Sequence, residues 1–126
     1  LWERATALGV ADRLVVLVSS DVGRRPFYNP NPGKDHYSAS SAIIMKKNVS
    51  WTNRVVGYSG PKHEKLTVDD SLNQADKGGT AITPEHVHMT LRNILGIDQH
   101  ELSQRYSFGN VDPLPLLHSG GSTGYL

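Results

Sequence analysis

The sequence predicts a domain of the α/β class, and three of its features support that prediction. An unbroken apolar run, Leu14–Val18, is typical of a strand that is covered on both faces, as in a parallel sheet. A predicted helix at Leu1–Leu8 leads into this run through a short link, which is the step that a parallel α/β layer uses. A second helix is predicted after Thr83, with Pro84 at its first position, an apolar stripe along one face and Gly96 at its end.

Two further short apolar runs, Ala42–Met45 and Arg54–Tyr58, are predicted to be strands. Between them and the second helix lies a polar stretch, Lys62–Thr80, that has little periodicity. A loop of this length is uncommon in a compact domain, so three alternatives stay open for it. The stretch is functional, or it forms a hairpin that the pattern does not resolve, or it is mobile.

The chain of 126 residues and 13.8 kDa has room for one domain. We expect this domain to span residues 1–117. From Ser103 onward the proline and glycine content predicts an extended chain, and residues 118–126 are predicted to be a flexible tail. Because the chain begins at Leu1 inside a predicted helix and lacks an initiator methionine, we expect it to be a piece of a longer product.

Composition narrows the classes of function. A net charge of +1 gives no electrostatic reason to expect nucleic acid or an acidic membrane as a partner. Cysteine is absent, which excludes disulfides and thiolate metal sites. No apolar run approaches the ~20 residues of a membrane-spanning helix, so we expect no membrane span.

Chemistry-bearing side chains follow the first predicted strand. The apolar run ends in two serines and Asp21, at the carboxyl end of a strand, where open α/β sheets bind ligands. A polar, proline-rich loop then returns to Asp35 and His36. Carboxylate oxygens and an imidazole brought together in this way would supply half of a metal site.

Each of these residues also has an ordinary structural interpretation. Asp21 could cap a loop, and Asp35 could either orient the imidazole of His36 or hold a turn. Arg24 and Arg25 could clamp an anion through their planar guanidinium groups or form a solvated rim.

The histidines outside this region offer no metal site. His86 and His88 lie two positions apart and cannot chelate a metal from one face of a helix, so we expect both at the surface.

Four motifs carry a resemblance to a known family. They are the strings SSDVGRRPFYN, GKDHY, RVVGYSG and ITPEHVHMTLRNILGID. In this order and spacing they resemble the C-terminal part of a bacterial family of unknown function in the alkaline phosphatase and sulfatase superfamily. Members of that family are commonly exported by the twin-arginine route. The likeness runs from about Leu8 to Leu117.

The resemblance implies a doubly wound α/β fold, of which this chain would be the C-terminal portion, with helices flanking the sheet. It also implies cleavage of phosphate or sulfate esters at a pair of divalent metals such as zinc or calcium. Asp21 would then ligate one metal and His36 the other, with Asp35 beside them. An exported or periplasmic location follows from the same resemblance.

Anionic substrate would be contacted by three basic residues of the same stretch. These residues are Arg24, Arg25 and Lys34.

Two departures from the superfamily pattern bear on activity. Alkaline phosphatases and sulfatases usually place histidine directly after the strand-end acid or asparagine, whereas this chain has Val22. The strands that carry the nucleophile and the first metal-binding acids are also absent from this chain. A catalytic metal needs three or four ligands and an open position, which Asp21 and His36 cannot provide alone. We therefore expect no catalytic residue and no turnover in this chain by itself.

Three classes of function stay open. The chain is part of a metal-dependent ester hydrolase, or it is a non-catalytic descendant that binds an anion or a protein, or it is a structural domain. Val22 favours the second class. We also expect either self-association or a complex with the N-terminal remainder of the same protein, because the strand Leu14–Val18 calls for neighbours on both sides.

Overall fold

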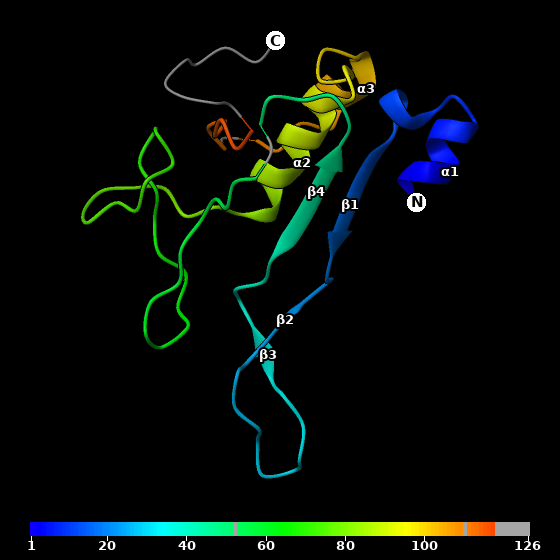
Figure 1. Cartoon of the computed structure of the whole chain (residues 1–126). Helices are drawn as coiled ribbons and strands as arrows, with labels where there is room; N and C mark the ends of the chain where they lie inside the picture. Colours follow the sequence, from blue (N-terminus) through cyan, green and yellow to red (C-terminus); the bar gives the residue numbers. More distant parts are fainter. Residues whose placement is uncertain (52, 110, 118–126) are drawn as a thin grey trace. The chain divides into compact units, whose positions relative to one another are not determined.

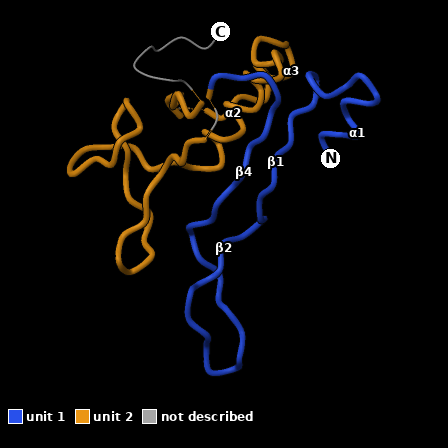
Figure 2. The backbone as a smooth tube through the Cα atoms, in the orientation of Figure 1, with its two compact units in different colours: residues 1–50 blue, residues 51–126 orange. Residues whose placement is uncertain are grey.

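The computed structural model has two compact units, Leu1–Ser50 and Trp51–Leu126, which are shown in different colours in Figure 2. It describes residues 1–51, 53–109 and 111–117, and each unit is treated separately below. Within these residues the fold is mixed α/β, with small antiparallel sheets and a few helices, which confirms the predicted class at that level. No described helix is long and apolar enough to cross a membrane.

The first unit is built on a two-stranded sheet of β1 (Val15–Ser19) and β4 (Ala42–Lys46) (Figure 1). A short helix, α1 (Trp2–Ala7), and a 3-10 helix, η1 (Ala11–Arg13), precede β1. The helix and strand that the sequence predicts at the start of the chain, and the strand at residues 42–45, are therefore confirmed, each to within a residue or two.

The sequence predicts that β1 lies in a parallel sheet and is buried on both faces. Both predictions are wrong for the sheet that the structure shows. The chain between the two strands folds into a hairpin of β2 (Gly23–Arg24) and β3 (His36–Tyr37), which reverses its direction. Because of that reversal β4 runs antiparallel to β1, as strands joined by such a connection do. Val18 and Ile43, which face each other in the register, are 51% and 59% exposed. The apolar run of β1 thus does not mark a strand buried on both faces.

Exposure of this sheet leads to a prediction about association. Among the described residues, β1 pairs with β4 alone, in a sheet of two strands. Because exposed strand edges and apolar surfaces promote association, we expect the isolated chain to self-associate through the apolar β1–β4 sheet. A lysine at Val18 puts a charge on that surface, and the Val18→Lys variant should shift the mass measured by light scattering toward the monomer. Val55→Lys, at a residue that is 92% exposed and lies outside any strand, is the control and should leave the mass unchanged. A wild-type chain that stays a dispersed monomer at high concentration would contradict the expectation.

The core of the second unit comes from segments that the sequence pattern does not identify. Val68 and Leu72, from the long polar stretch, are buried together with Leu114 and Leu116 near the end of the described chain. These two leucines lie in the stretch predicted to be extended, where residues 111–115 form no helix or strand, but the sequence pattern does not predict their burial. Four partly buried residues pack against the cluster: Val56, Ile82, Val87 and Leu117.

Backbone hydrogen bonds explain how a polar stretch can supply this core. Val68 and Thr80 exchange two backbone N–H···O bonds of 2.9 and 2.8 Å. A carboxylate oxygen of Asp69 accepts from the N–H groups of Ser71 (2.9 Å) and Asn73 (3.0 Å), which closes a tight turn. Of the three alternatives for residues 62–80, the unresolved hairpin is the one that these bonds support.

The predicted strand Arg54–Tyr58 is wrong, because these residues form no ladder in the structure. Val55 is 92% exposed, and Gly57 adopts a φ of +94°, outside the strand conformation. Leu66 donates a backbone bond to the carbonyl of Tyr58, and an isolated bridge between Ser59 and Lys65 follows it.

The helix predicted after Thr83 is confirmed as α2 (Pro84–Ile94), with Thr83 as its N-cap. Its end is a Schellman motif. Gly96, at a φ of +66°, donates its N–H to the carbonyl of Asn93, and Ile97 donates to the carbonyl of Arg92, both at 2.9 Å.

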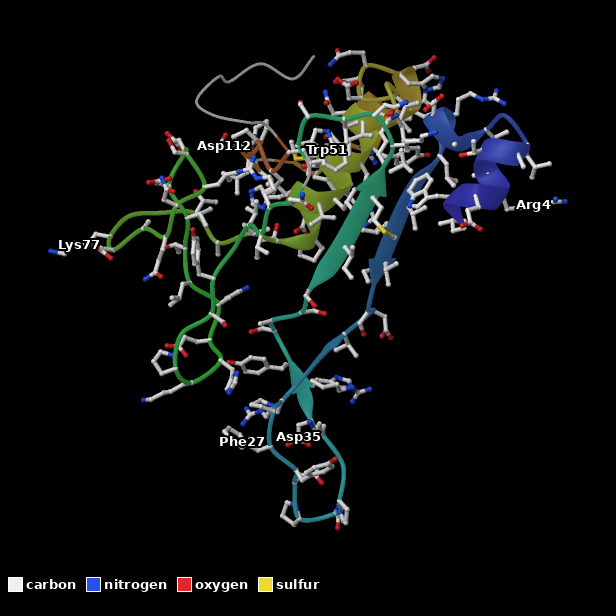
Figure 3. The ribbon with its side chains drawn as sticks, in the orientation of Figure 1. Arg4, Phe27, Asp35, Trp51, Lys77 and Asp112 are labelled. Carbon is white, nitrogen blue, oxygen red and sulfur yellow. The ribbon has the colours of Figure 1, made fainter. Side chains whose placement is uncertain are left out.

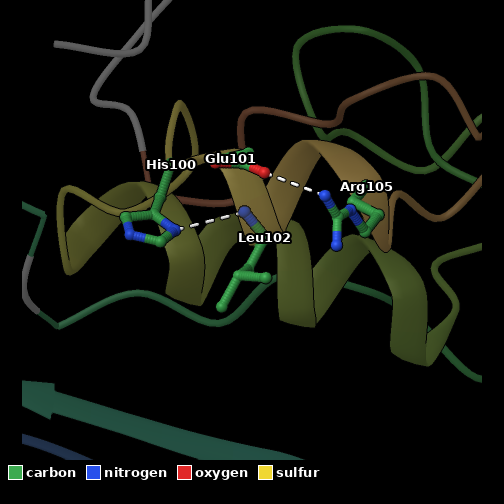
Figure 4. A network of polar contacts seen from close by, with 4 residues as sticks. All are labelled: His100, Glu101, Leu102 and Arg105. Carbon is green, nitrogen blue, oxygen red and sulfur yellow. Dashed lines mark hydrogen bonds and ion pairs between the residues drawn. The ribbon is translucent and has the colours of Figure 1, made fainter.

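A short helix that the sequence pattern does not predict, α3 (Glu101–Arg105), follows α2. His100 is its N-cap: the ring Nδ1 accepts a 3.2 Å bond from the N–H of Leu102 (Figure 4). Glu101 and Arg105 form an exposed ion pair of 2.9 Å across one helical turn. The extended chain predicted from Ser103 onward is thus wrong for residues 103–105, which lie in this helix. The flexible tail predicted at residues 118–126 lies outside the described residues.

Candidate functional site

The residues singled out by the sequence lie on the β2–β3 hairpin of the first unit and on the strand end before it. Figure 3 labels Phe27 and Asp35 on this hairpin. Its two short strands pair antiparallel, with Gly23 opposite Tyr37 and Arg24 opposite His36. The loop therefore does return His36 to the strand that follows Asp21, as the sequence suggests.

Asn29 holds the tip of the hairpin. Its side-chain oxygen accepts bonds from the N–H groups of Asn31 (3.1 Å) and Gly33 (3.0 Å), and its own N–H donates to the carbonyl of Gly33 (2.8 Å). Its amide nitrogen donates to a carboxylate oxygen of Asp35 at 2.7 Å. Of the two interpretations of Asp35, the turn-holding one thus has a hydrogen bond in the structure. Sequence reasoning missed Asn29, although an asparagine before prolines and a glycine is a known turn signal.

Three basic side chains and one imidazole share this hairpin. A guanidinium nitrogen of Arg24 donates to the carbonyl oxygen of Lys34 at 3.1 Å. The Nζ of Lys34 lies 5.1 Å from the centre of the Tyr28 ring, a cation–π distance. Arg24 and His36 are a cross-strand pair, so their side chains leave the same face of the hairpin. These side chains, and that of Arg25, are exposed, so the hairpin presents an accessible cationic surface to a solvent-borne anion.

Asp21 lies just outside the paired part of this hairpin. It is exposed and accepts a 3.4 Å bond from the hydroxyl of Ser20. Arg24 is the residue opposite His36, and Asp21 precedes it by three positions. If the strand continued to Asp21, this separation would be roughly 10 Å. The chain bends at residues 21 and 22, between the end of β1 and the start of β2.

The ligand set that the structure offers to a metal is small. Among residues 1–51, 53–109 and 111–117, no group of three or more His, Cys, Asp or Glu side chains is arranged to hold an ion. Asp21 and His36 are suitable donors for zinc, but they provide two of the three or four protein ligands that a zinc site needs. The residues of this chain thus fit a metal only in part.

His86, which the sequence places at the surface, is buried, with 4% of its area exposed. Its ring Nδ1 accepts a 3.0 Å bond from the backbone N–H of Thr83, and its own carbonyl accepts from the hydroxyl of Thr90 at 2.8 Å. The histidine therefore takes the third position of a capping box, which glutamate or glutamine usually holds. Its spacing from Thr83 was the available signal. His88 is exposed, as predicted, and its ring stacks on Phe108 with centroids 5.8 Å apart.

The same helix start gives a pH prediction for Glu85. The hydrogen bond from the Thr83 side chain, together with a backbone N–H, holds the pKa of this carboxyl below its usual range. A depressed folded-state pKa means that the ionised form stabilises the fold above the unfolded-state pKa, and this contribution disappears as the pH falls through the folded-state pKa. Glu85→Gln should therefore lower thermal stability slightly at neutral pH and have no such effect in acid. Glu64→Gln is the control, and a pH-independent effect of Glu85→Gln would contradict the assignment.

In the second unit, a cavity of about 280 Å³ lies between α2 and the segment that includes α3. Arg92, one of its lining residues, donates to the carbonyls of Ser103 (2.9 Å) and Tyr106 (3.0 Å). Its guanidinium carbon also lies 4.3 Å from the centre of the Phe108 ring. The guanidinium of Arg92 thus links α2 to α3 and to the residue after it. This structural role is sufficient to explain why an arginine lines the cavity.

Comparison with protein-family models, with curated proteins and with solved structures finds no match to this chain. The chemistry of the site therefore stands on the hairpin itself, with its accessible cations, its imidazole and its rigid turn.

Proposed function

We propose that this chain is part of a metal-dependent hydrolase of phosphate or sulfate esters, and that it is exported to the periplasm. In this proposal the β2–β3 hairpin contributes His36 as a metal ligand, with Asp21 as a second ligand. Three cations on the hairpin contact the anionic ester: Arg24, Arg25 and Lys34. The doubly wound, alkaline-phosphatase-like sheet belongs to the same proposal.

The observation that carries the proposal is the pairing of Arg24 with His36. These residues come from two separate motifs, GRR and GKDH, and the hairpin places them directly across from each other. Imidazole is the commonest side-chain ligand of metals in proteins. The guanidinium fork is also the side chain best suited to hold a phosphate or sulfate through paired hydrogen bonds.

Zinc or calcium would supply Lewis-acid activation of the ester when bound. Because this chain offers two candidate ligands, the remaining ligands and the nucleophile would come from the N-terminal remainder that the resemblance implies. The chain alone should therefore turn over no ester.

A non-catalytic, anion-binding or protein-binding descendant of the same fold is the second candidate. Val22 favours it, since the superfamily pattern has a histidine ligand at that position. In this case the hairpin would still bind an anion, but no metal-dependent turnover would follow.

Assays of generic phosphate and sulfate monoesters with added zinc, manganese or calcium separate these candidates. We expect no turnover by this chain, turnover by the full-length protein, and loss of that turnover in His36→Ala and Asp21→Asn. The control His63→Ala, in the second unit, should retain it. If the full-length protein binds sulfate but hydrolyses no ester, the result contradicts the hydrolase and supports the non-catalytic candidate. Turnover by the isolated chain that disappears in His36→Ala would contradict the proposal that the nucleophile and the remaining metal ligands lie outside this chain.

A further inference from the structure

The tip of the β2–β3 hairpin exposes two neighbouring aromatic rings. Phe27 is 69% exposed and Tyr28 is 74% exposed, although both lie in a turn that is fixed by hydrogen bonds. Large apolar side chains in a rigid, exposed turn are costly to leave in water and suggest a partner that covers them.

Part of the backbone polarity at this tip is satisfied within the turn itself. Three of its residues are prolines and have no N–H group to solvate: Pro26, Pro30 and Pro32. The N–H groups of four others already donate to Asp35, Gly33 or the side chain of Asn29: Arg25, Asn29, Asn31 and Gly33. Each donor that is bonded or absent in this way lowers the cost of moving the tip out of bulk water.

Two basic residues at the ends of this tip flank the two rings in the chain. Arg25 comes shortly before the rings, and Lys34 comes after them with its ammonium group 5.1 Å from the centre of the Tyr28 ring. Exposed aromatic rings flanked by basic side chains match the two layers of an anionic bilayer surface. The rings enter the boundary between headgroups and acyl chains, and the cations contact headgroup phosphates.

We propose that the tip, residues 25–34, docks this protein on a membrane surface that contains anionic phospholipids. Single-stranded nucleic acid also combines stacking with positive charge, but its binding proteins present several platforms along a groove. Here two adjacent rings occupy one tip, and the ammonium of Lys34 already lies over the Tyr28 ring. The geometry therefore favours the lipid surface.

This inference goes beyond the proposed hydrolase and does not need it. Headgroup binding at the tip requires no metal, no nucleophile and no turnover. A failure of membrane binding would leave the ester assays unaffected, and a failure of those assays would leave membrane binding unaffected.

Vesicle co-sedimentation with the full chain tests the proposal. We expect binding to vesicles of phosphatidylcholine mixed with phosphatidylglycerol and little binding to phosphatidylcholine alone. Phe27→Ala with Tyr28→Ala should lower the partition coefficient at least about tenfold. Tyr106→Ala, which removes a 65% exposed aromatic ring from the second unit, is the matched control and should bind as the wild type does.

A second variant separates the shape of the tip from its composition. Asn29→Ala keeps every ring and every cation of the tip but removes the three hydrogen bonds that the Asn29 side chain makes across the turn. It should therefore also weaken binding to vesicles. Soluble glycerol phosphate should not displace the protein from vesicles, since it offers the anion without the apolar layer. Equal binding to neutral vesicles, or no effect of the ring substitutions, would overturn the proposal. Ring-dependent binding to a single-stranded oligonucleotide in place of vesicles would overturn it as well.

Discussion

Replacement of Gly23 by alanine is expected to open the β2–β3 hairpin. A Cβ atom at this position would collide with the backbone carbonyl oxygens of Ala39 and Tyr37, and backbone atoms cannot move aside as a flexible side chain can. Overpacking of this kind typically costs ~1–3 kcal/mol. The N–H of Arg25, which donates to the carbonyl of Asp35 in the intact hairpin, should then exchange with solvent at least about tenfold faster.

Gly33→Ala is the matched control for this substitution. A Cβ at Gly33 would lie 3.4 Å from the carbonyl oxygen of Asn31, which is an ordinary contact. Hydrogen exchange at Arg25 should therefore be close to that of the wild type in Gly33→Ala. Equal protection in Gly23→Ala and in the wild type would mean that the close approach of residues 37–39 to Gly23 does not exist in solution.

The second large effect is expected from Leu72→Ala. Leu72 is 5% exposed and packs with Val68 and two leucines near the end of the described chain. Removal of a buried leucine side chain costs about 2–5 kcal/mol, a large share of the 5–15 kcal/mol by which a typical domain is stable. Denaturation in urea should show this loss as a lower midpoint.

Leu102→Ala provides the control for the core, because Leu102 is 52% exposed. Its effect should stay within about 0.5 kcal/mol, as for most surface substitutions. Similar midpoints for the two variants would show that residues 62–80 do not supply the core of the second unit.

The elements that local signals define were predicted well. α2 has both a start signal in Thr83 and Pro84 and a stop signal in Gly96, and those residues act as expected. The strands β1 and β4 follow from uninterrupted apolar runs. The formation of these elements depends on a few neighbouring residues, and such local patterns can be read from a single sequence.

Pairing and burial were harder to predict, because they depend on distant parts of the chain. The direction of β4 relative to β1 follows from the hairpin between them, which the apolar pattern alone does not reveal. Val68 and Leu72 are isolated apolar residues among polar ones. The turn at Asp69 and the backbone pairing of Val68 with Thr80 hold the segment in which they pack with Leu114 and Leu116.

Parts of the candidate site were also predictable, and others were not. The motif GKDHY located His36 and Lys34, and the hairpin brings them beside the residues that follow Asp21. The role of Asn29 in closing the turn depends on three side-chain bonds whose partners lie up to six positions away. The two-residue spacing of His86 and His88 predicts a surface position for His86, whereas its three-residue spacing from Thr83 is the one that the capping box uses.

The central claim is that the β2–β3 hairpin binds an anion and a metal, and nuclear magnetic resonance titration of the labelled chain tests it most directly. Sulfate should produce saturable shifts in the signals of Arg24 and Lys34, and zinc should produce them in the ring signals of His36. Gly23→Ala should lose both responses, whereas Gly33→Ala should keep them. Saturable shifts centred on His63 or His100, or shifts at the hairpin that survive in Gly23→Ala, would contradict the claim.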